Sequence, residues 1–125
     1  AWTMQGMALA QLERFAEAIS SYDRAIALFP INYKGWYNRA NALLKLGSIH
    51  EALHSYEETL KLRPDCTKAW YNRGIVLAQL KRFDDAIASY DKALEARPHF
   101  SAAHYNRGNL LYKLGQYAEA LNSYE

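Results

Sequence analysis

The chain repeats itself every 34 residues, and this period constrains its fold more than any other feature. Its three prolines lie at positions 30, 64 and 98. Writing the sequence at that period brings whole motifs into register: Trp2, Trp36 and Trp70, followed by His104; YNRA, YNRG and YNRG from Tyr37, Tyr71 and Tyr105; and SYD, SYE, SYD and SYE from Ser21, Ser55, Ser89 and Ser123. Such self-similarity predicts a protein built from stacked copies of one small unit.

Each copy carries two helical patterns separated by a short break. In the third copy, Trp70, Gly74 and Leu77 step by three or four residues, which places them on one face of a helix. The same spacing recurs over residues 86–94, and Pro98 then prevents the second helix from continuing. No segment shows the strict alternation of a half-buried strand. The sequence therefore predicts antiparallel helix pairs stacked side by side.

The period, the helix pairs and the pattern W-x₂-[LR]-[GA]…A…Y…A…P resemble the tetratricopeptide repeat (TPR) family. The resemblance covers the whole chain and implies an all-α fold, a right-handed superhelical α-solenoid of antiparallel helix pairs. It implies a single array over residues 1–125, with repeats at about 1–32 (partial), 33–66, 67–100 and 101–125 (truncated). Some anchor positions depart from the family pattern: Arg39, Arg73 and Arg107 replace leucine, Ala40 replaces glycine, Thr59 replaces alanine and His104 replaces an aromatic residue.

The sequence shows no polar capping helix of the kind that usually ends a natural repeat array. Residues 117–125 read as an ordinary repeat that stops inside its second helix. We therefore expect a fragment of a longer array, whose uncapped terminal repeats favour end-to-end self-association.

The TPR resemblance implies that the first helix of each pair lines a concave groove. At 100° per residue, the stripe opposite the core-facing one is the candidate binding surface. Its site residues are Lys34, Tyr37, Asn38, Asn41, Lys45, Lys68, Tyr71, Asn72, Tyr105, Asn106, Asn109 and Lys113. Tyrosine offers contact area at low entropic cost, and an asparagine amide can pair with both a peptide N–H and a C=O. The lysines favour neutral or acidic ligands.

These features favour a non-enzymatic protein–protein interaction module that binds an extended peptide segment of a partner and needs no cofactor. One alternative is the substrate-presenting TPR arm of a larger enzyme such as a glycosyltransferase. A similar asparagine ladder is known in the TPR superhelix of the O-linked N-acetylglucosamine transferases. The other alternative is a purely structural scaffold.

The sequence does not match the two-carboxylate clamp with which TPR co-chaperones grip the C-termini of heat-shock proteins. That pattern needs Lys and Asn, then Asn, then Lys and Arg. The corresponding residues are Tyr37, Asn41, Asn72, Ala102 and Asn106, or in the other register Thr3, Met7, Asn38, Lys68 and Asn72. Only two positions fit in either register, so we do not expect a clamp for an acidic C-terminus.

Three arginines lie at the edge of the apolar face of the first helices. Each arginine either packs its stem on neighbouring side chains while the guanidinium reaches water, or pairs with the acid that ends the preceding SYD or SYE motif. The second interpretation gives the pairs Arg39–Asp23, Arg73–Glu57 and Arg107–Asp91. Such ion pairs would order the stack, and exposed ones contribute only about 0–1 kcal/mol each.

The stretch HEALH, from His50 to His54, matches the zinc-protease motif H-E-x-x-H. In repeat register, however, both histidines fall in variable, polar columns on the outward stripe of a second helix. A catalytic zinc site also needs a third ligand and a cleft. We therefore interpret HEALH as one variant of the repeat and expect no metal site.

Other features indicate what kind of partner and compartment to expect. The net charge of +2 is too small to imply a nucleic-acid partner, and no apolar run is long enough to span a bilayer. Cys66 is the only cysteine, in an inter-repeat turn, and we expect it to be a bystander. These features are compatible with a reducing cytoplasm, without nucleic acid or membrane as partner.

Overall fold

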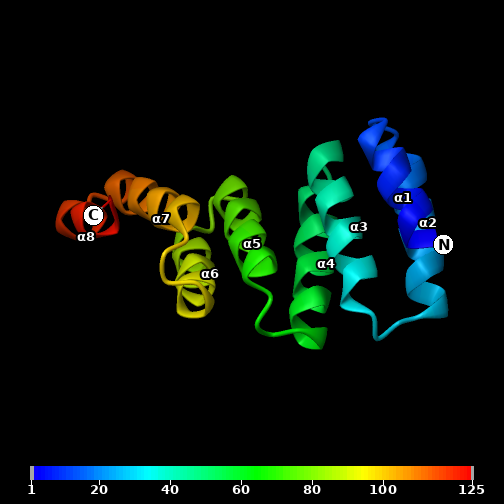
Figure 1. The fold of residues 1–125 in the computed structure, drawn as a ribbon. Coiled ribbons are helices and arrows are strands. Elements are labelled where there is room, and N and C mark those ends of the chain that lie inside the picture. The colour runs from blue at the N-terminus through cyan, green and yellow to red at the C-terminus, as the bar shows by residue number, and fades with distance from the viewer. Residues whose placement is uncertain (1, 125) are drawn as a thin grey trace. The chain divides into compact units, whose positions relative to one another are not determined.

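The structure is a computed structural model that describes residues 2–124. Eight helices account for most of this range (Figure 1): α1 (Trp2–Gln11), α2 (Phe15–Leu28), α3 (Tyr33–Leu46), α4 (Ile49–Leu62), α5 (Thr67–Gln79), α6 (Phe83–Ala96), α7 (Ser101–Lys113) and α8 (Tyr117–Tyr124). The described residues contain no strand. The all-α fold class predicted from the sequence is confirmed.

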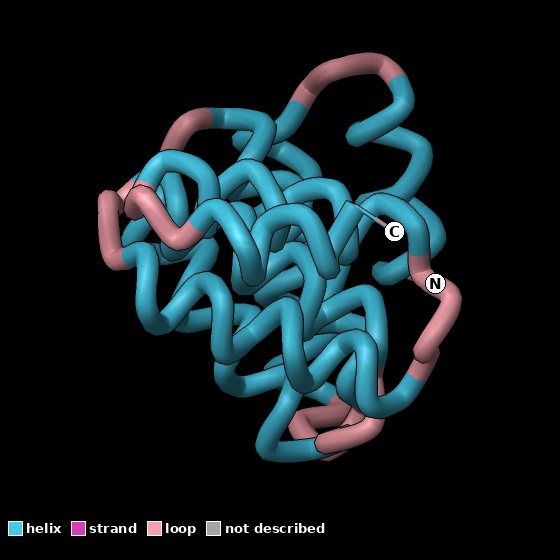
Figure 2. Tube along the Cα trace, turned by 90° about the vertical axis from the view of Figure 1, so that its left-hand side faces the viewer, coloured by secondary structure: helices cyan, strands magenta, loops and turns pink. Residues whose placement is uncertain are grey.

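The chain divides into two compact units, Ala1–Pro64 and Asp65–Glu125. In the first unit, α1 packs on α2, α2 on α3, and α3 on α4. In the second, α5 packs on α6, α6 on α7, and α7 on α8. Figure 2 shows the short loops that join successive helices. That both units belong to one continuous array stays a prediction.

The turn inside each helix pair uses a left-handed backbone residue. Gly47 (φ 92°) fills this position after α3, and Gly115 (φ 80°) fills it near the end of α7. Glu13 and Lys81 fill the corresponding positions after α1 and α5, each with a φ of 61°. A side chain at positive φ is strained, so these two residues hold the turn at an energetic cost that glycine would avoid.

A tyrosine of the second helix packs against a glycine of the first in three of the pairs. A Cβ added to Gly74 would lie 2.6 Å from Cε1 of Tyr90, and the same holds for Gly108 and Tyr124. In the first pair, Tyr22 meets Gly6 in this way. The second pair has Ala40, fully buried, in the glycine column. The tyrosine and the small residue together allow the two helices to approach closely.

The repeated arginines connect the helices, and two of the three pairs predicted from the sequence are present. Arg39 donates to Asp23 Oδ1 over 2.7 Å, and Arg107 donates to Asp91 Oδ1 over 2.6 Å. The third predicted pair, Arg73 with Glu57, would join the two units and stays a prediction.

Each of these arginines also donates to the buried serine of its own SYD or SYE motif. The acceptors are Ser55 at 2.7 Å from Arg39, Ser89 at 2.6 Å from Arg73, and Ser123 at 2.6 Å from Arg107. The sequence analysis did not assign a role to these serines. A buried hydroxyl needs a hydrogen-bond partner, and the guanidinium supplies it.

Candidate functional site

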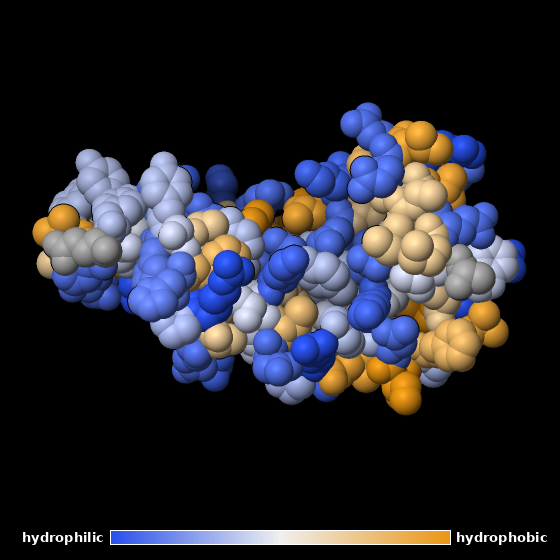
Figure 3. All heavy atoms as spheres, in the orientation of Figure 1, coloured by the Kyte–Doolittle hydropathy of each residue, from blue (hydrophilic) through white to orange (hydrophobic). Residues whose placement is uncertain are grey.

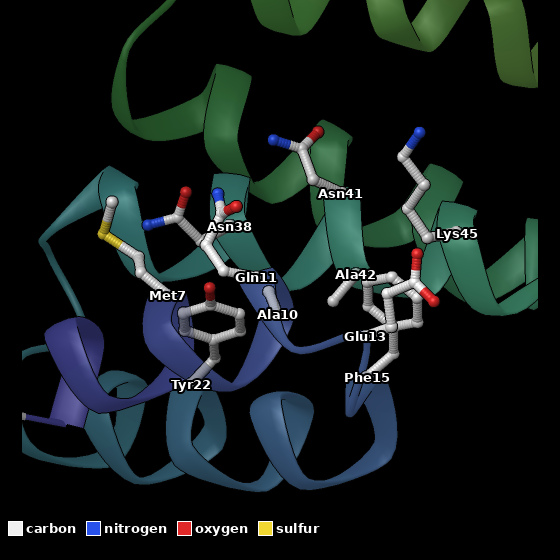
Figure 4. A pocket seen from close by; sticks show the side chains of 10 residues that line it. All are labelled: Met7, Ala10, Gln11, Glu13, Phe15, Tyr22, Asn38, Asn41, Ala42 and Lys45. Carbon is white, nitrogen blue, oxygen red and sulfur yellow. The ribbon is translucent and has the colours of Figure 1, made fainter.

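A groove with a volume of about 440 Å³ opens in the first unit, between α1, α2 and α3 (Figure 4). It is lined by Met7, Ala10, Gln11, Glu13, Phe15, Tyr22, Asn38, Asn41, Ala42 and Lys45. Apolar side chains and the ring of Tyr22 form part of the wall, three amides lie among them, and one carboxylate and one ammonium group complete the lining. A ligand here would meet an apolar surface with a few polar groups placed around it, as in most binding sites.

Tyr22 and Asn38 bring polar groups into this groove. The Tyr22 ring is almost completely buried, and burial raises the pKa of its phenol. Figure 4 shows the hydroxyl pointing toward the amides of Gln11 and Asn38. The phenol therefore stays protonated at neutral pH and can donate or accept a hydrogen bond in the groove.

A second groove, with a volume of about 280 Å³, lies in the other unit. It is lined by Ile75, Ala78, Gln79, Tyr90, Asn106, Asn109 and Leu110. Each of these seven residues lies 68 residues, or two repeat periods, after a residue that lines the first groove. The repeat therefore builds the same site once in each unit.

The two grooves differ in size and charge at a few positions. Ala42 of the first groove corresponds to Leu110 of the second, and the longer side chain takes up space that the first groove leaves open. Glu13, which lines the first groove, corresponds to Lys81. Lys45 corresponds to Lys113, and neither Lys81 nor Lys113 is among the residues that line the second groove.

Several of the asparagines already form hydrogen bonds within the protein. Asn41 Oδ1 accepts from the Tyr56 hydroxyl over 2.5 Å, and Asn109 Oδ1 accepts from the Tyr124 hydroxyl over 2.6 Å. Asn106 donates through Nδ2 to the Tyr71 hydroxyl over 2.8 Å. These bonds fix the orientation of the amides, so that a ligand would meet groups that are already positioned.

The structure places five of the twelve predicted site residues in these two grooves: Asn38, Asn41, Lys45, Asn106 and Asn109. The other seven, which do not line either groove, are Lys34, Tyr37, Lys68, Tyr71, Asn72, Tyr105 and Lys113. The Tyr71 ring packs on Phe100 at 4.9 Å between centroids, and Tyr105 lines a separate cavity with His99 and His104. That the three tyrosines form one binding surface stays a prediction.

The sequence analysis missed two pairs of groove residues. Gln11 and Gln79 stand at the end of the first helix of their repeats, and Tyr22 and Tyr90 belong to the second helix. The search for candidates covered only one stripe of the first helix. The repeat register itself was the available signal, because both pairs recur at the same 68-residue shift.

The HEALH histidines lie on α4 and are not among the residues that line either groove. His54 packs edge-on against Trp36, with ring centroids 5.9 Å apart. Within residues 2–124, no cluster of three or more His, Cys, Asp or Glu side chains is placed to hold a metal ion.

The tetratricopeptide repeat model matches residues 3–53, 37–99 and 82–125. The chain belongs to the tetratricopeptide repeat family. This confirms the resemblance that the 34-residue period indicated. A search of curated proteins found no significant match.

Solved structures with the same fold include several of MamA. One has a TM-score of 0.96 at 20% identity and covers 98% of this chain and 72% of its own. MamA 41-end from Desulfovibrio magneticus RS-1 has a TM-score of 0.91 at 22% identity and covers 98% of this chain and 70% of its own. The first TPR of Spaghetti (RPAP3), bound to the HSP90 peptide SRMEEVD, has a TM-score of 0.89 at 24% identity, with coverages of 91% and 90%. At these identities the likeness shows the fold alone.

None of the described TPR helices is both long and apolar enough to cross a membrane.

Proposed function

We propose that this TPR chain is a protein-interaction module in which each of two equivalent grooves holds an extended peptide segment of a partner. The observation that carries the proposal is the recurrence of one site, with the same amides on the same elements, at a shift of 68 residues. A scaffold surface would not need to keep this combination of groups in both units.

The groove chemistry suits a peptide backbone. Asn38 and Gln11 in the first groove, like Asn106 and Gln79 in the second, each offer a donor and an acceptor. A peptide in extended conformation exposes an N–H and a C=O at every residue, and amide side chains can satisfy both without demanding a particular sequence. The apolar wall then contributes affinity by burying one partner side chain.

One structural neighbour supports the peptide proposal. The first TPR of Spaghetti (RPAP3) has the same fold over 91% of this chain and was solved with a short peptide bound. A TPR unit of this size can therefore hold a peptide. The identity of the neighbour's ligand does not extend to this chain, because the sequence lacks the clamp pattern.

The test is a display selection of short random peptides on the intact chain, followed by titration of the enriched peptides. The variant Asn38→Ala/Asn106→Ala removes one amide from each groove, neither of them at a helix end. We expect binding to weaken by about tenfold or more, equivalent to ~1.4 kcal/mol. Helicity by circular dichroism should not change.

Asn122→Ala serves as the matched control, because Asn122 is an exposed asparagine on α8 that lines neither groove. It should bind the enriched peptides like the parent chain. If the double variant also binds like the parent, or if no peptide is enriched, the peptide-groove proposal is wrong and the purely structural scaffold becomes the better interpretation.

A further inference from the structure

The turns that carry Glu13 and Lys81 have the same backbone conformation. Both residues have a φ of 61°. The Glu13 N–H donates to the Ala10 carbonyl over 2.9 Å, and the Lys81 N–H donates to the Ala78 carbonyl over 3.0 Å. The N–H of the following residue, Arg14 or Arg82, donates to the carbonyl of Leu9 or Leu77, over 2.9 Å in both turns. Lys81 therefore leaves the backbone at the place in the second unit where Glu13 leaves it in the first.

This position belongs to the edge of the groove. Glu13 and Lys45 both line the first groove, and Figure 4 shows them on the same side of it, near Phe15. In the second unit, the Lys113 ammonium lies 5.9 Å from the centre of the Phe83 ring, which corresponds to Phe15. Lys113 thus stands where Lys45 stands in the first unit.

The charge of the two groove edges is therefore different. The first edge combines one carboxylate with one ammonium group, Glu13 and Lys45. The corresponding positions of the second unit carry two ammonium groups, Lys81 and Lys113. Neither lysine is among the residues that line the second groove, and those residues include no charged side chain. Two acids follow this turn on α6, Asp84 and Asp85, and Asp85 pairs with Arg82 over 2.8 Å. A charged group beside a groove attracts ligands of the opposite charge and rejects ligands of the same charge.

The charge difference occurs at a backbone position where the other two turns use glycine, Gly47 and Gly115. Glu13 and Lys81 thus both have a strained backbone at positive φ, and they place opposite charges at equivalent positions of the repeat. Strained backbone residues are often found at binding sites.

We propose that the residue at this left-handed turn position determines which charge each groove accepts. The second groove, with Lys81, takes an acidic side chain from within the partner's extended segment, and the first groove, with Glu13, takes an uncharged one. This inference rests on the proposed function and names the partner chemistry: a segment with an internal Asp or Glu. The acid is a side chain rather than a C-terminal carboxylate, because the clamp pattern is absent.

The experiment uses the intact chain and synthetic peptides with blocked ends, drawn from the display selection described above. Each peptide is made in an acidic form and in a form with Asp and Glu replaced by Asn and Gln. Side-chain amide NMR signals report the site: those of Asn106 and Asn109 for the second groove, and those of Asn38 and Asn41 for the first. We expect the acidic form to perturb mainly the second pair.

Two variants at the left-handed turn position test whether its charge determines which ligand binds, and a third variant is the control for net charge. Lys81→Glu should weaken binding of the acidic peptide by about fivefold or more and leave binding of its neutral form unchanged. Lys92→Glu, on the exposed part of α6 beside Glu95, changes the net charge by the same amount and should have little effect. Glu13→Lys should bring the acidic peptide into the first groove, seen as new shifts of Asn38 and Asn41.

The outcomes separate the two proposals. If peptides bind but Lys81→Glu and Lys92→Glu weaken binding of the acidic form equally, the effect comes from net charge. The proposal that the turn residue determines the accepted charge is then wrong. The same holds if the acidic form perturbs both grooves equally in the parent chain. If no peptide binds at all, the groove proposal fails and the proposal about the turn residue fails with it. Lys81→Gly, which removes the charge without backbone strain, shows whether any loss comes from misfolding.

Discussion

Tyr90 is a tyrosine whose ring is buried between the helices of its pair while its hydroxyl lies next to a groove. Its side chain is 2% exposed, and it lines the second groove. Burial raises the pKa of Tyr90 strongly, the neighbouring Tyr71 raises it further, and the nearby Asn106 amide lowers it. The neutral phenol is therefore much more stable in the folded chain than the phenolate.

This shift makes stability depend on alkaline pH. The unfolded phenol has a pKa of about 10, and the folded pKa is higher. The stabilisation is fully present below about pH 10 and is lost as the pH rises toward the folded pKa, because only the unfolded chain then releases the proton. For one such tyrosine the free energy of unfolding should fall by up to about 1.4 kcal/mol per pH unit. In Tyr90→Phe this alkaline loss should be smaller, as measured by urea unfolding between pH 8 and about pH 11.

The control for the alkaline measurement is Tyr105→Phe, at a ring that is 61% exposed. Its pH dependence should follow that of the parent chain. A parent profile that stays flat up to about pH 11, or an equal slope in Tyr90→Phe, would contradict the burial of this phenol.

At the scale of the elements, the turns inside the helix pairs show where the sequence pattern and the backbone disagree. Gly47 and Gly115 adopt positive φ without a steric penalty, whereas Glu13 and Lys81 adopt it with a side chain. Replacing a strained residue by glycine removes a penalty of roughly 1–2 kcal/mol but adds freedom to the unfolded chain, which costs roughly 0.5–1 kcal/mol.

We therefore expect Lys81→Gly to raise the free energy of unfolding by about 0.5–1 kcal/mol. Urea unfolding at neutral pH measures this difference. Lys81→Ala keeps the positive-φ strain and removes only the rest of the side chain, so it should give no such gain. An equal gain in both variants would mean that the lysine charge, rather than the backbone, destabilises the turn.

The element scale also shows how far the sequence alone could predict this molecule. The helical spacing and Pro98 placed the second helix of the third repeat over residues 86–94, and α6 ends at Ala96. Asn38 and Asn106 were found because a stripe at 100° per residue determines which side chains share a face. Gln11 and Tyr22 were missed because a groove between three helices collects residues from all of them.

Two predicted site lysines lie outside the grooves, and their place in the binding surface stays a prediction. Lys34 and Lys68 lie on the predicted stripe, but each stands in the first turn of its helix and is exposed outside the grooves. Helical periodicity predicts on which face of the helix a side chain lies, but not whether the groove extends to that position along the helix axis. The charge reversal from Glu13 to Lys81 gained its meaning only when the backbone of the two turns proved to be the same.

At the scale of the whole molecule, one inter-repeat turn of the first unit carries a run of exposed apolar side chains. Leu28, Phe29 and Ile31 are 60%, 65% and 84% exposed. Figure 3 shows hydrophobic atoms gathered at this end of α2 and the turn that leads to α3. The positions that correspond to Phe29 and Ile31 carry charged or polar residues in the later turns: Arg63 and Asp65, then Arg97 and His99. Contiguous exposed apolar side chains favour association.

We expect this apolar turn to drive self-association of the chain at high concentration. Phe29→Arg/Ile31→Asp copies the residues that the next turn uses, so the backbone should accept them. In the parent chain, light scattering should give a mass above 14.3 kDa that rises with concentration. In the double variant the mass should fall toward the monomer value, because two exposed apolar side chains are replaced by charged ones.

Met4→Asn is the comparison for the alternative surface, since it places on α1 the residue that Asn38 supplies in the next repeat. Met4 is 67% exposed and lies on α1, in the first of the terminal repeats that the sequence analysis expected to self-associate. If Met4→Asn lowers the mass and the turn variant does not, association runs through the end of the array. A parent chain that scatters as a monomer at every concentration would contradict both surfaces.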